Sequence, residues 1–365
     1  MSLSRRGFLF SAAAVPILSE GVLAEMAAGP VPATAPEVWL RLSNNENPWG
    51  PCQGACDAVI KAAPKGSRYP QAQREQMQTR LAKLHDVDRE MIVVGNGSGE
   101  ILRMAVGAFA ANQRNVVVAD PTYEACGRYA DATGSAALKV ALTSDFRHDL
   151  RKMAASKAGL IYVCNPNNPT ASLTPKQEVD AMVVAMPAGA VALIDEAYCH
   201  FVDDPSFETA IKHVQAGKDV VVARTFSKIY GLAGYRVGYA VARKELAVAL
   251  RRQILDNNVN MMGLEAAMAS LDVADLVPRN REKNQKSRRI LLDWCDRNKM
   301  KYAPAHANFV FFHINRPVAP VVQGMRARGV SVGRPFPPFN DWMRVSVGTE
   351  EEMRSFLREY EALQA

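Results

Sequence analysis

A lysine and an aspartate that could do covalent amine chemistry follow two apolar stretches of the sequence. Lys228 lies shortly after the β-branched run Val220–Ala223, and Asp195 directly follows the run Val191–Ile194. A lysine at a strand end is usually solvated. One aimed into a crevice lined by polar side chains can have its pKa lowered and form a Schiff base. A buried carboxylate needs a partner, such as the protonated ring nitrogen of an electron-sink cofactor. The alternative is an aspartate that caps the next turn.

A glycine-rich segment, Gly97-Ser98-Gly99-Glu100, stands where a helix is expected to begin. Free backbone N–H groups and the positive end of a helix dipole make such a segment a phosphate site. Ser227 and Arg236 could add further phosphate ligands. The spacing matches neither a Walker loop nor a dinucleotide fingerprint. The alternative interpretation is a plain glycine turn in which Ser98 caps the helix.

Three further side chains could hold an aromatic cofactor at the same place. Tyr123 could stack on an aromatic ring, and Asn168 and Tyr198 could donate to a phenolic oxygen. Taken alone, Tyr123 is better explained by core packing. Taken alone, Asn168, in a run rich in asparagine and proline, is better explained by a turn.

These residues follow short β-branched runs that alternate with helical segments from about residue 90. The predicted strands are Met91–Val94, Asn115–Ala119, Leu160–Val163, Val191–Ile194 and Val220–Ala223, and the helices include Glu100–Ala111 and Pro175–Met186. This alternation predicts a mostly parallel α/β sheet whose strands are buried on both faces. Ligands bind at the carboxyl ends of such strands, so the five polar segments should meet in one crevice.

The pattern changes after about residue 243, where long helical stretches predominate. The predicted elements are a helix at Pro278–Lys299, a strand at Ala307–Phe312, a helix at Val318–Arg328, a strand at Met343–Val347 and a helix at Glu350–Leu363. We therefore expect a large domain over residues 51–260 and a small α/β domain over 261–365. Residues 25–50 would form an N-terminal arm that packs with the small domain.

The first 24 residues have the layout of an export signal. Arg5-Arg6 precedes an apolar stretch, Phe8–Leu18, and the small residue Ala24 follows Val22-Leu23 at a predicted cleavage site. The paired arginines are similar to those of the twin-arginine signal, which carries folded proteins. We therefore expect export to the periplasm. A basic, apolar cytoplasmic extension is the alternative.

Composition excludes several classes of protein. With 365 residues, 48% hydrophobic and 22% charged, the chain is neither disordered, collagen-like nor a coiled coil. The net charge of +7 is scattered, so no nucleic-acid partner is expected. No apolar stretch reaches the roughly 18–20 residues of a membrane span. The six cysteines lack the spacing of a disulfide scaffold or a zinc site, so no metal is expected.

Nine motifs, in order over residues 40–360, resemble those of the class I/II pyridoxal-phosphate aminotransferases, and within them the histidinol-phosphate aminotransferase group. These motifs are Asn44-Asn45-Glu46-Asn47-Pro48-Trp49-Gly50, Arg68-Tyr69-Pro70, Gly95–Glu100, Pro121-Thr122-Tyr123, Asn165–Thr170, Asp195–Tyr198, Thr225–Arg236, Asn308-Phe309 and Met343–Thr349. The resemblance implies the fold-type I architecture: a large domain with a mostly parallel, mixed sheet sandwiched by helices, plus a smaller α/β domain.

The resemblance also implies pyridoxal 5′-phosphate as the cofactor and assigns a role to each candidate around its ring. Lys228 would hold the cofactor covalently and shuttle a proton, and Asp195 would keep the ring nitrogen protonated. Asn168 and Tyr198 would hydrogen-bond the phenolic oxygen, and Tyr123 would stack on the ring. We expect Lys228, Asp195 and Tyr198 to be the catalytic residues.

The phosphate of the cofactor would be held by the backbone of Ser98, Gly99 and Glu100 together with Ser227 and Arg236. The group usually has an aspartate at position 99, but the backbone N–H of Gly99 would still serve.

On the substrate side, the resemblance assigns anion binding to two arginines. Arg344 would bind the α-carboxylate of a donor such as glutamate, Arg334 would grip a distal anion, and Asn47 would contact substrate. Tyr69 would reach the cofactor phosphate of a neighbouring subunit, which predicts a homodimer.

The predicted reaction is transfer of an amino group from an amino acid or amino-alcohol phosphate to a 2-oxo acid such as 2-oxoglutarate. The run Arg334-Pro335-Phe336-Pro337-Pro338-Phe339 is unusually aromatic for the substrate mouth, and it favours an apolar or aromatic side chain. The alternatives are an aromatic amino acid aminotransferase, a decarboxylase or lyase similar to the threonine-phosphate decarboxylases, and a binding module without turnover. An export signal also fits poorly with histidine biosynthesis, a cytoplasmic pathway.

Overall fold

The structure is a computed structural model that describes residues 37–364. The predicted signal segment, residues 1–24, and the first part of the predicted arm lie outside the described residues. Within the described part of the chain, none of the helices is both long enough and apolar enough to cross a membrane.

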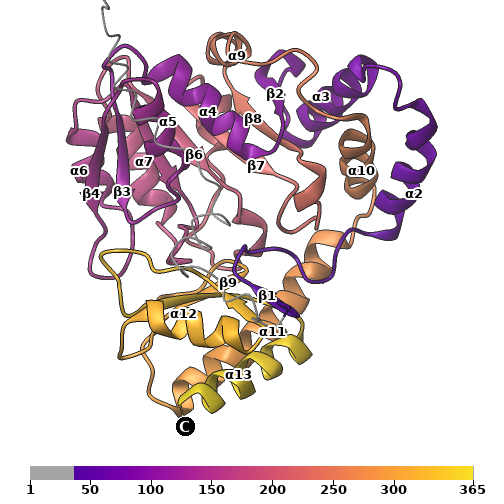
Figure 1. The fold of residues 1–365 in the computed structure, drawn as a ribbon. Helices are drawn as coiled ribbons and strands as arrows, with labels where there is room; N and C mark the ends of the chain where they lie inside the picture. The colour runs from indigo at the N-terminus through magenta and orange to yellow at the C-terminus, as the bar shows by residue number, and fades with distance from the viewer. Residues whose placement is uncertain (1–36, 365) are drawn as a thin grey trace, which may run out of the picture.

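A seven-stranded sheet forms the centre of the larger part of the molecule (Figure 1). Its strands, in spatial order, are β2 (Ile92–Gly95), β8 (Gly238–Ala242), β7 (Val220–Thr225), β6 (Val191–Asp195), β5 (Leu160–Cys164), β3 (Val116–Asp120) and β4 (Ala137–Ala141). β8 runs antiparallel to both of its neighbours, and the remaining pairs are parallel. The prediction of a mostly parallel, mixed sheet is therefore confirmed.

Helices cover both faces of this sheet, because successive strand residues point to opposite sides and almost all of them are apolar. On one face lie α4 (Ser98–Phe109), α5 (Ala125–Ala132) and α9 (Lys244–Arg251). On the other lie α2 (Gln53–Ala62), α3 (Gln71–His85), α6 (Leu150–Ala155), α7 (Lys176–Ala185), α8 (Ile211–Gln215) and α10 (Met261–Leu271). Within β3, for example, Val116 and Val118 pack under α4 and α5, whereas Val117 and Ala119 face the other layer.

The smaller part has its own hydrophobic core and two short sheets. β1 (Leu40–Leu42) pairs in parallel with β10 (Val330–Val332), and β9 (Phe309–His313) pairs antiparallel with β11 (Trp342–Ser346). α11 (Leu276–Arg297), α12 (Val318–Ala327) and α13 (Glu350–Gln364) pack around them. The described portion of the N-terminal arm thus lies in the smaller part through β1.

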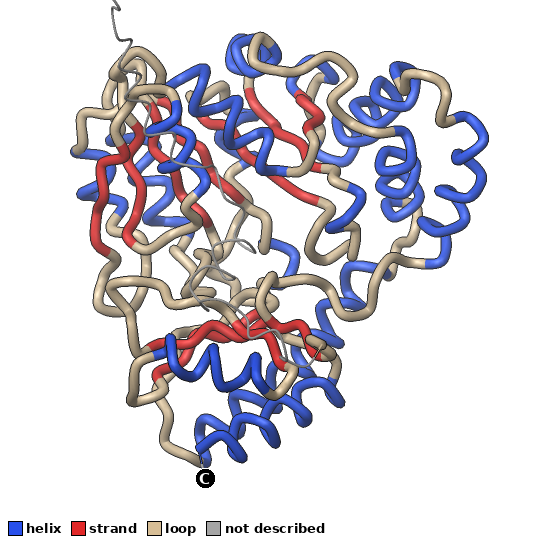
Figure 2. The backbone as a smooth tube through the Cα atoms, in the orientation of Figure 1, coloured by secondary structure: helices blue, strands red, loops and turns tan. Residues whose placement is uncertain are grey.

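The two parts join along α11, later than the boundary predicted after residue 260. α10 packs against α2 and α3 of the larger part. Leu276 at the start of α11 belongs to the core beneath the large sheet, whereas Trp294 near its end belongs to the smaller core. The change to a helical pattern in the sequence thus begins before the chain leaves the first core. Loops, drawn in tan in Figure 2, occupy the level between the central sheet and the C-terminal strands.

Candidate active site

The carboxyl ends of five parallel strands line one cavity of about 220 Å³. The lining includes residues at or just after the end of each of these strands: Ser98 and Gly99 after β2, Tyr123 after β3, Cys164 at the end of β5, Asp195 at the end of β6 with Tyr198 after it, and Ser227 and Lys228 after β7. The N-terminal arm closes the cavity with Asn44 and Glu46, and Arg236 precedes β8. The geometry therefore brings together all the residues predicted to touch the cofactor ring except Asn168, which borders an adjoining space.

The arm holds Lys228 and Tyr198 in place. Lys228 Nζ donates to the backbone oxygens of Asn44 and Asn45, at 3.2 and 3.1 Å. Asn45 Nδ2 in turn donates to the hydroxyl of Tyr198 at 3.1 Å. Lys228 Nζ also lies 5.5 Å from the centroid of the Tyr198 ring. A half-buried amine over an aromatic ring, held by two carbonyls, is well placed to act on a molecule in the cavity.

Asp195 is buried at the end of β6, with 2% of its surface exposed. Tyr162 donates its hydroxyl proton to Oδ2 and the backbone N–H of Ala197 donates to Oδ1, both at 3.1 Å. Burial nevertheless raises the pKa of Asp195 from 3.8 to about 6, against the opposing effects of these hydrogen bonds and of Lys228. A nearby cation would stabilise the ionised form, and a protonated pyridine ring would supply one.

We expect Asp195→Asn to stabilise the cofactor-free protein at neutral and basic pH. The raised pKa means that the folded state binds the Asp195 proton more tightly than the unfolded state, so stability falls as pH rises from 3.8 to about 6. Above that range the ionised carboxylate costs up to about 3 kcal/mol, and asparagine removes this cost. Urea unfolding of both cofactor-free proteins at about pH 4 and about pH 8 measures the difference. A variant less stable at the higher pH would contradict this electrostatic account.

The N-terminus of α4 and two side chains form a cationic cradle at the other end of the cavity. Gly97 adopts φ +75°, and a Cβ there would overlap the guanidinium of Arg236. Arg236 Nη1 lies 3.5 Å from Ser227 Oγ, and no side chain in the described part of the chain caps α4. Glu100 contributes only its backbone, because its carboxylate accepts from Asn96 N at 2.6 Å and from the side chain of Asn258.

These features fit pyridoxal phosphate. A phosphate matches the uncapped helix start beside Ser227 and Arg236. A pyridinium matches the buried Asp195 carboxylate, and an aldehyde matches the amine of Lys228. Among residues 37–364, no cluster of histidine, cysteine, aspartate and glutamate side chains could hold a metal ion.

Arg344, on β11, is completely buried beside the cavity. Its Nη1 donates to Asn168 Oδ1 at 2.7 Å, and its Nη2 donates to the backbone oxygen of Ser43. The oxygen of the Asn168 amide is thus engaged, which leaves its nitrogen as the atom that can donate to a cofactor. Arg344 therefore couples the C-terminal strand both to the arm and to the cofactor side of the site.

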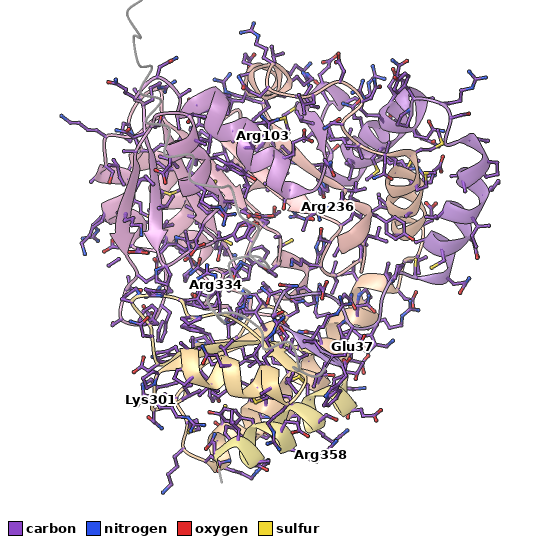
Figure 3. All side chains as sticks on the ribbon, in the orientation of Figure 1. Glu37, Arg103, Arg236, Lys301, Arg334 and Arg358 are labelled. Atoms are coloured by element: carbon purple, nitrogen blue, oxygen red, sulfur yellow. The ribbon has the colours of Figure 1, made fainter. Side chains whose placement is uncertain are left out.

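Arg334 is buried at the edge of the site, where the two parts of the molecule meet (Figure 3). Its Nη2 pairs with Glu124 Oε1 at 2.5 Å, and its guanidinium carbon lies 4.3 Å from the centroid of the Phe336 ring. The sequence prediction treated Arg334 as available for a distal anion and gave Glu124 no role. Phe336 borders the site, whereas Phe339 packs against Phe146 and Trp342.

Two other predicted residues lie outside the cavity. Asn47 Nδ2 donates to the backbone oxygens of Lys228 and Ile229, and its Oδ1 accepts from Trp49 N. Both ends of this amide contact backbone atoms, so Asn47 positions the turn after Lys228, and its predicted contact with substrate stays a prediction. Tyr69 is 77% exposed on the loop before α3.

Sequence reasoning missed a buried ion pair behind the cavity. Arg224, near the end of β7, donates from Nε to Glu196 Oε2 at 2.9 Å, and Thr209 Oγ1 donates to the same carboxylate. The pair ties the loop after β6 to β7, next to Asp195. The available signal was the position of two charged residues at the ends of apolar strands, where a buried charge requires a partner.

Comparison with known proteins agrees with this geometry. The sequence pattern of the family described as aminotransferase class I and II matches residues 37–359. Histidinol-phosphate aminotransferases of Moorella thermoacetica and Symbiobacterium thermophilum are 36% and 35% identical to the chain, covering 87% and 89% of it and 84% and 90% of their own lengths. The fold is similar to that of the Sinorhizobium meliloti histidinol-phosphate aminotransferase crystallised with pyridoxal 5′-phosphate. The TM-score is 0.86 at 24% identity, over 98% of this chain and 99% of that one.

Proposed function

Because the chain belongs to the class I and II aminotransferases and is a pyridoxal-phosphate-dependent enzyme, we propose that it transfers an amino group from an amino acid or amino-alcohol phosphate to a 2-oxo acid. The observation that carries this proposal is the shared cavity in which Lys228 Nζ, held by the arm, and the buried Asp195 carboxylate both lie. The relatives named for histidinol phosphate support a donor of that class.

The bound cofactor supplies a conjugated ring that takes up the electron pair released at the substrate carbon. Lys228 would hold the cofactor through Nζ, and the same amine, once the substrate amine had displaced it, would carry a proton to and from the substrate Cα. The Asp195 carboxylate keeps the ring nitrogen protonated. Tyr198 and Asn168 donate to the phenolic oxygen, and the side chain of Tyr123 stacks on the ring.

The phosphate is held by the first backbone N–H groups of α4, at Ser98, Gly99 and Glu100, together with Ser227 and Arg236. On the substrate side, Arg344 binds the carboxylate, or the phosphate of an amino-alcohol phosphate. Its planar fork of donors suits both anions.

A donor screen on the purified enzyme tests the function. Single-turnover mixing with L-glutamate, L-phenylalanine and L-histidinol phosphate should convert the cofactor from its aldehyde form to its amine form, followed by absorbance. Addition of a 2-oxo acid should restore the starting spectrum. A decarboxylase would instead release carbon dioxide without any 2-oxo acid. Neither conversion nor release of carbon dioxide with any of these donors would leave only a binding role.

The active unit in this proposal is a homodimer in which Tyr69 reaches the cofactor phosphate of the neighbouring subunit. The support is that the Tyr69 side chain is exposed on its loop and does not line the cofactor cavity of its own subunit. Sedimentation velocity measures the mass of the cofactor-bound protein directly, and a monomer that turns over substrate would overturn the assignment.

The proposed site of action is the periplasm, reached by the twin-arginine route. Changing Arg5 and Arg6 together to lysine should trap the protein in the cytoplasm, because the transport signal depends on the arginine pair. Fractionation of cells that produce either form, with detection of the cofactor-bound enzyme in each fraction, measures the outcome. Equal periplasmic recovery of both forms would show that export does not depend on the arginine pair, and cytoplasmic retention of the unchanged protein would favour the cytoplasmic alternative.

A further inference from the structure

A second cavity, of about 320 Å³, lies next to the cofactor cavity and shares Tyr123 with it. Its lining includes Glu124 and Arg128 from the start of α5 and Phe336 and Pro337 from the loop between β10 and β11. A small space bounded by Tyr123, Glu124, Phe336, Asn168 and Arg334 lies between the two cavities. Arg344 contacts Asn168 and lies 4.9 Å from the Phe336 centroid, so a donor whose α-anion is bound by Arg344 would place its side chain near Phe336.

One wall of this small space is the aromatic ring of Phe336. Phe336 is 4% exposed, and its ring meets that of Phe311 edge-on at 6.3 Å. Phe311 in turn stacks on Trp342 at 5.3 Å. The guanidinium carbons of Arg334 and Arg344 lie 4.3 and 4.9 Å from the Phe336 centroid. Such a ring offers apolar and stacking contacts to a neutral side chain without being displaced.

At this point one carboxylate, that of Glu124, pairs with two arginines of the protein. Glu124 Oε1 lies 2.5 Å from Arg334 Nη2, and Glu124 Oε2 lies 3.7 Å from Arg128 Nη1. The Arg334 side chain is 9% exposed, whereas that of Glu124 is 44% exposed. An anionic group on the substrate must therefore compete with an intramolecular carboxylate for Arg334, and it approaches that like charge as it does so.

We infer that Glu124 determines donor specificity. By keeping Arg334 ion-paired, it lowers the preference of the enzyme for donors with a second anion and favours donors whose side chains are uncharged and apolar or aromatic. The inference rests on the proposed function, in which Arg344 binds the first anion. It assigns Glu124 a role that acts through Arg334.

The test compares kcat/KM for L-glutamate and L-phenylalanine in the cofactor-bound enzyme, since both donors present the same α-carboxylate to Arg344. Glu124→Gln should raise the glutamate-to-phenylalanine ratio at least about tenfold, which corresponds to about 1.4 kcal/mol. In an Arg334→Gln background the same substitution should leave the ratio unchanged, because the arginine it releases is gone.

The matched control is Glu359→Gln, which removes a carboxylate paired with Arg328 at 2.7 Å on the far side of the smaller part. It should leave the donor ratio within about twofold of the parent value. This inference would be overturned if Glu124→Gln left the glutamate-to-phenylalanine ratio unchanged, or if it raised the ratio to the same extent in the Arg334→Gln background. Either result would leave the proposed amino transfer intact. Absence of turnover with every donor would instead overturn the proposed function, and this inference with it.

Discussion

Lys228→Ala should abolish covalent attachment of the cofactor and reduce turnover by at least about 10²–10⁴-fold, the usual contribution of a positioned proton-transfer group. Lys228 is the one lysine among the described residues that line the cavity. Its Nζ is held by the arm carbonyls beside Tyr198. The cradle formed by Ser227, Arg236 and the start of α4 remains in this variant. Pyridoxal phosphate should therefore still bind, but reversibly.

Borohydride reduction followed by peptide mapping measures the attachment directly. The parent enzyme should carry the label on Lys228, and the alanine variant should carry none after gel filtration. Lys212→Ala is a suitable control, because Lys212 is ion-paired with Asp180 and Glu208 outside the cavity. A label on any other lysine of the parent enzyme would show that Lys228 is not the residue that attaches the cofactor.

Arg344→Lys should slow the half-reaction with L-glutamate by at least about tenfold. A guanidinium binds a carboxylate through two parallel hydrogen bonds, and lysine cannot reproduce that fork. Arg344 is fully buried and also holds Asn168 at 2.7 Å, so its replacement disturbs two contacts at once. Disrupting a buried, hydrogen-bonded charge typically costs about 2–5 kcal/mol.

Two readouts separate a role of Arg344 in substrate binding from a role in cofactor attachment. Covalent attachment to Lys228 should persist, because the carbonyls that hold Lys228 Nζ belong to Asn44 and Asn45 of the arm. Single-turnover absorbance gives the rate, and borohydride labelling gives the attachment. Arg354→Lys, on the exposed face of α13, is the conservative control. An unchanged half-reaction, or lost attachment with normal folding, would contradict the assignment of Arg344 to the substrate.

The sequence predicted the strands best where their residues form continuous apolar runs. Strands buried on both faces form continuous apolar runs, so β2, β3, β5, β6 and β7 were all predicted to within about two residues. β4 was missed because it is an edge strand that alternates with exposed residues such as Lys139. β8 was missed because it follows the cradle residue Arg236 after a single valine, so its run merged with the preceding motif.

The residues of the candidate site also fall into two groups, those that the sequence could place and those that it could not. Residues that follow strand ends converge by topology alone, which explains why Lys228, Asp195 and Ser98 could be placed from sequence. Pairings across the chain have no such rule. The contact between Glu124 and Arg334 joins two loops far apart in sequence, and Asn47 turned toward backbone because its amide meets the carbonyls after Lys228.

The anchoring of the arm also sets the order in which a newly made chain can acquire its active centre. The carbonyls that hold Lys228 belong to Asn44 and Asn45, and Asn45 is itself fixed by Ser346 and Asn308 near the other end of the chain. β1 likewise has no strand partner until β10 has been synthesised. The large sheet can form while translation continues, but the segment that leaves the ribosome early must wait for nearly the last residues. In a nascent chain, the arm therefore lacks the partners that fix it beside Lys228 until the smaller part has been synthesised.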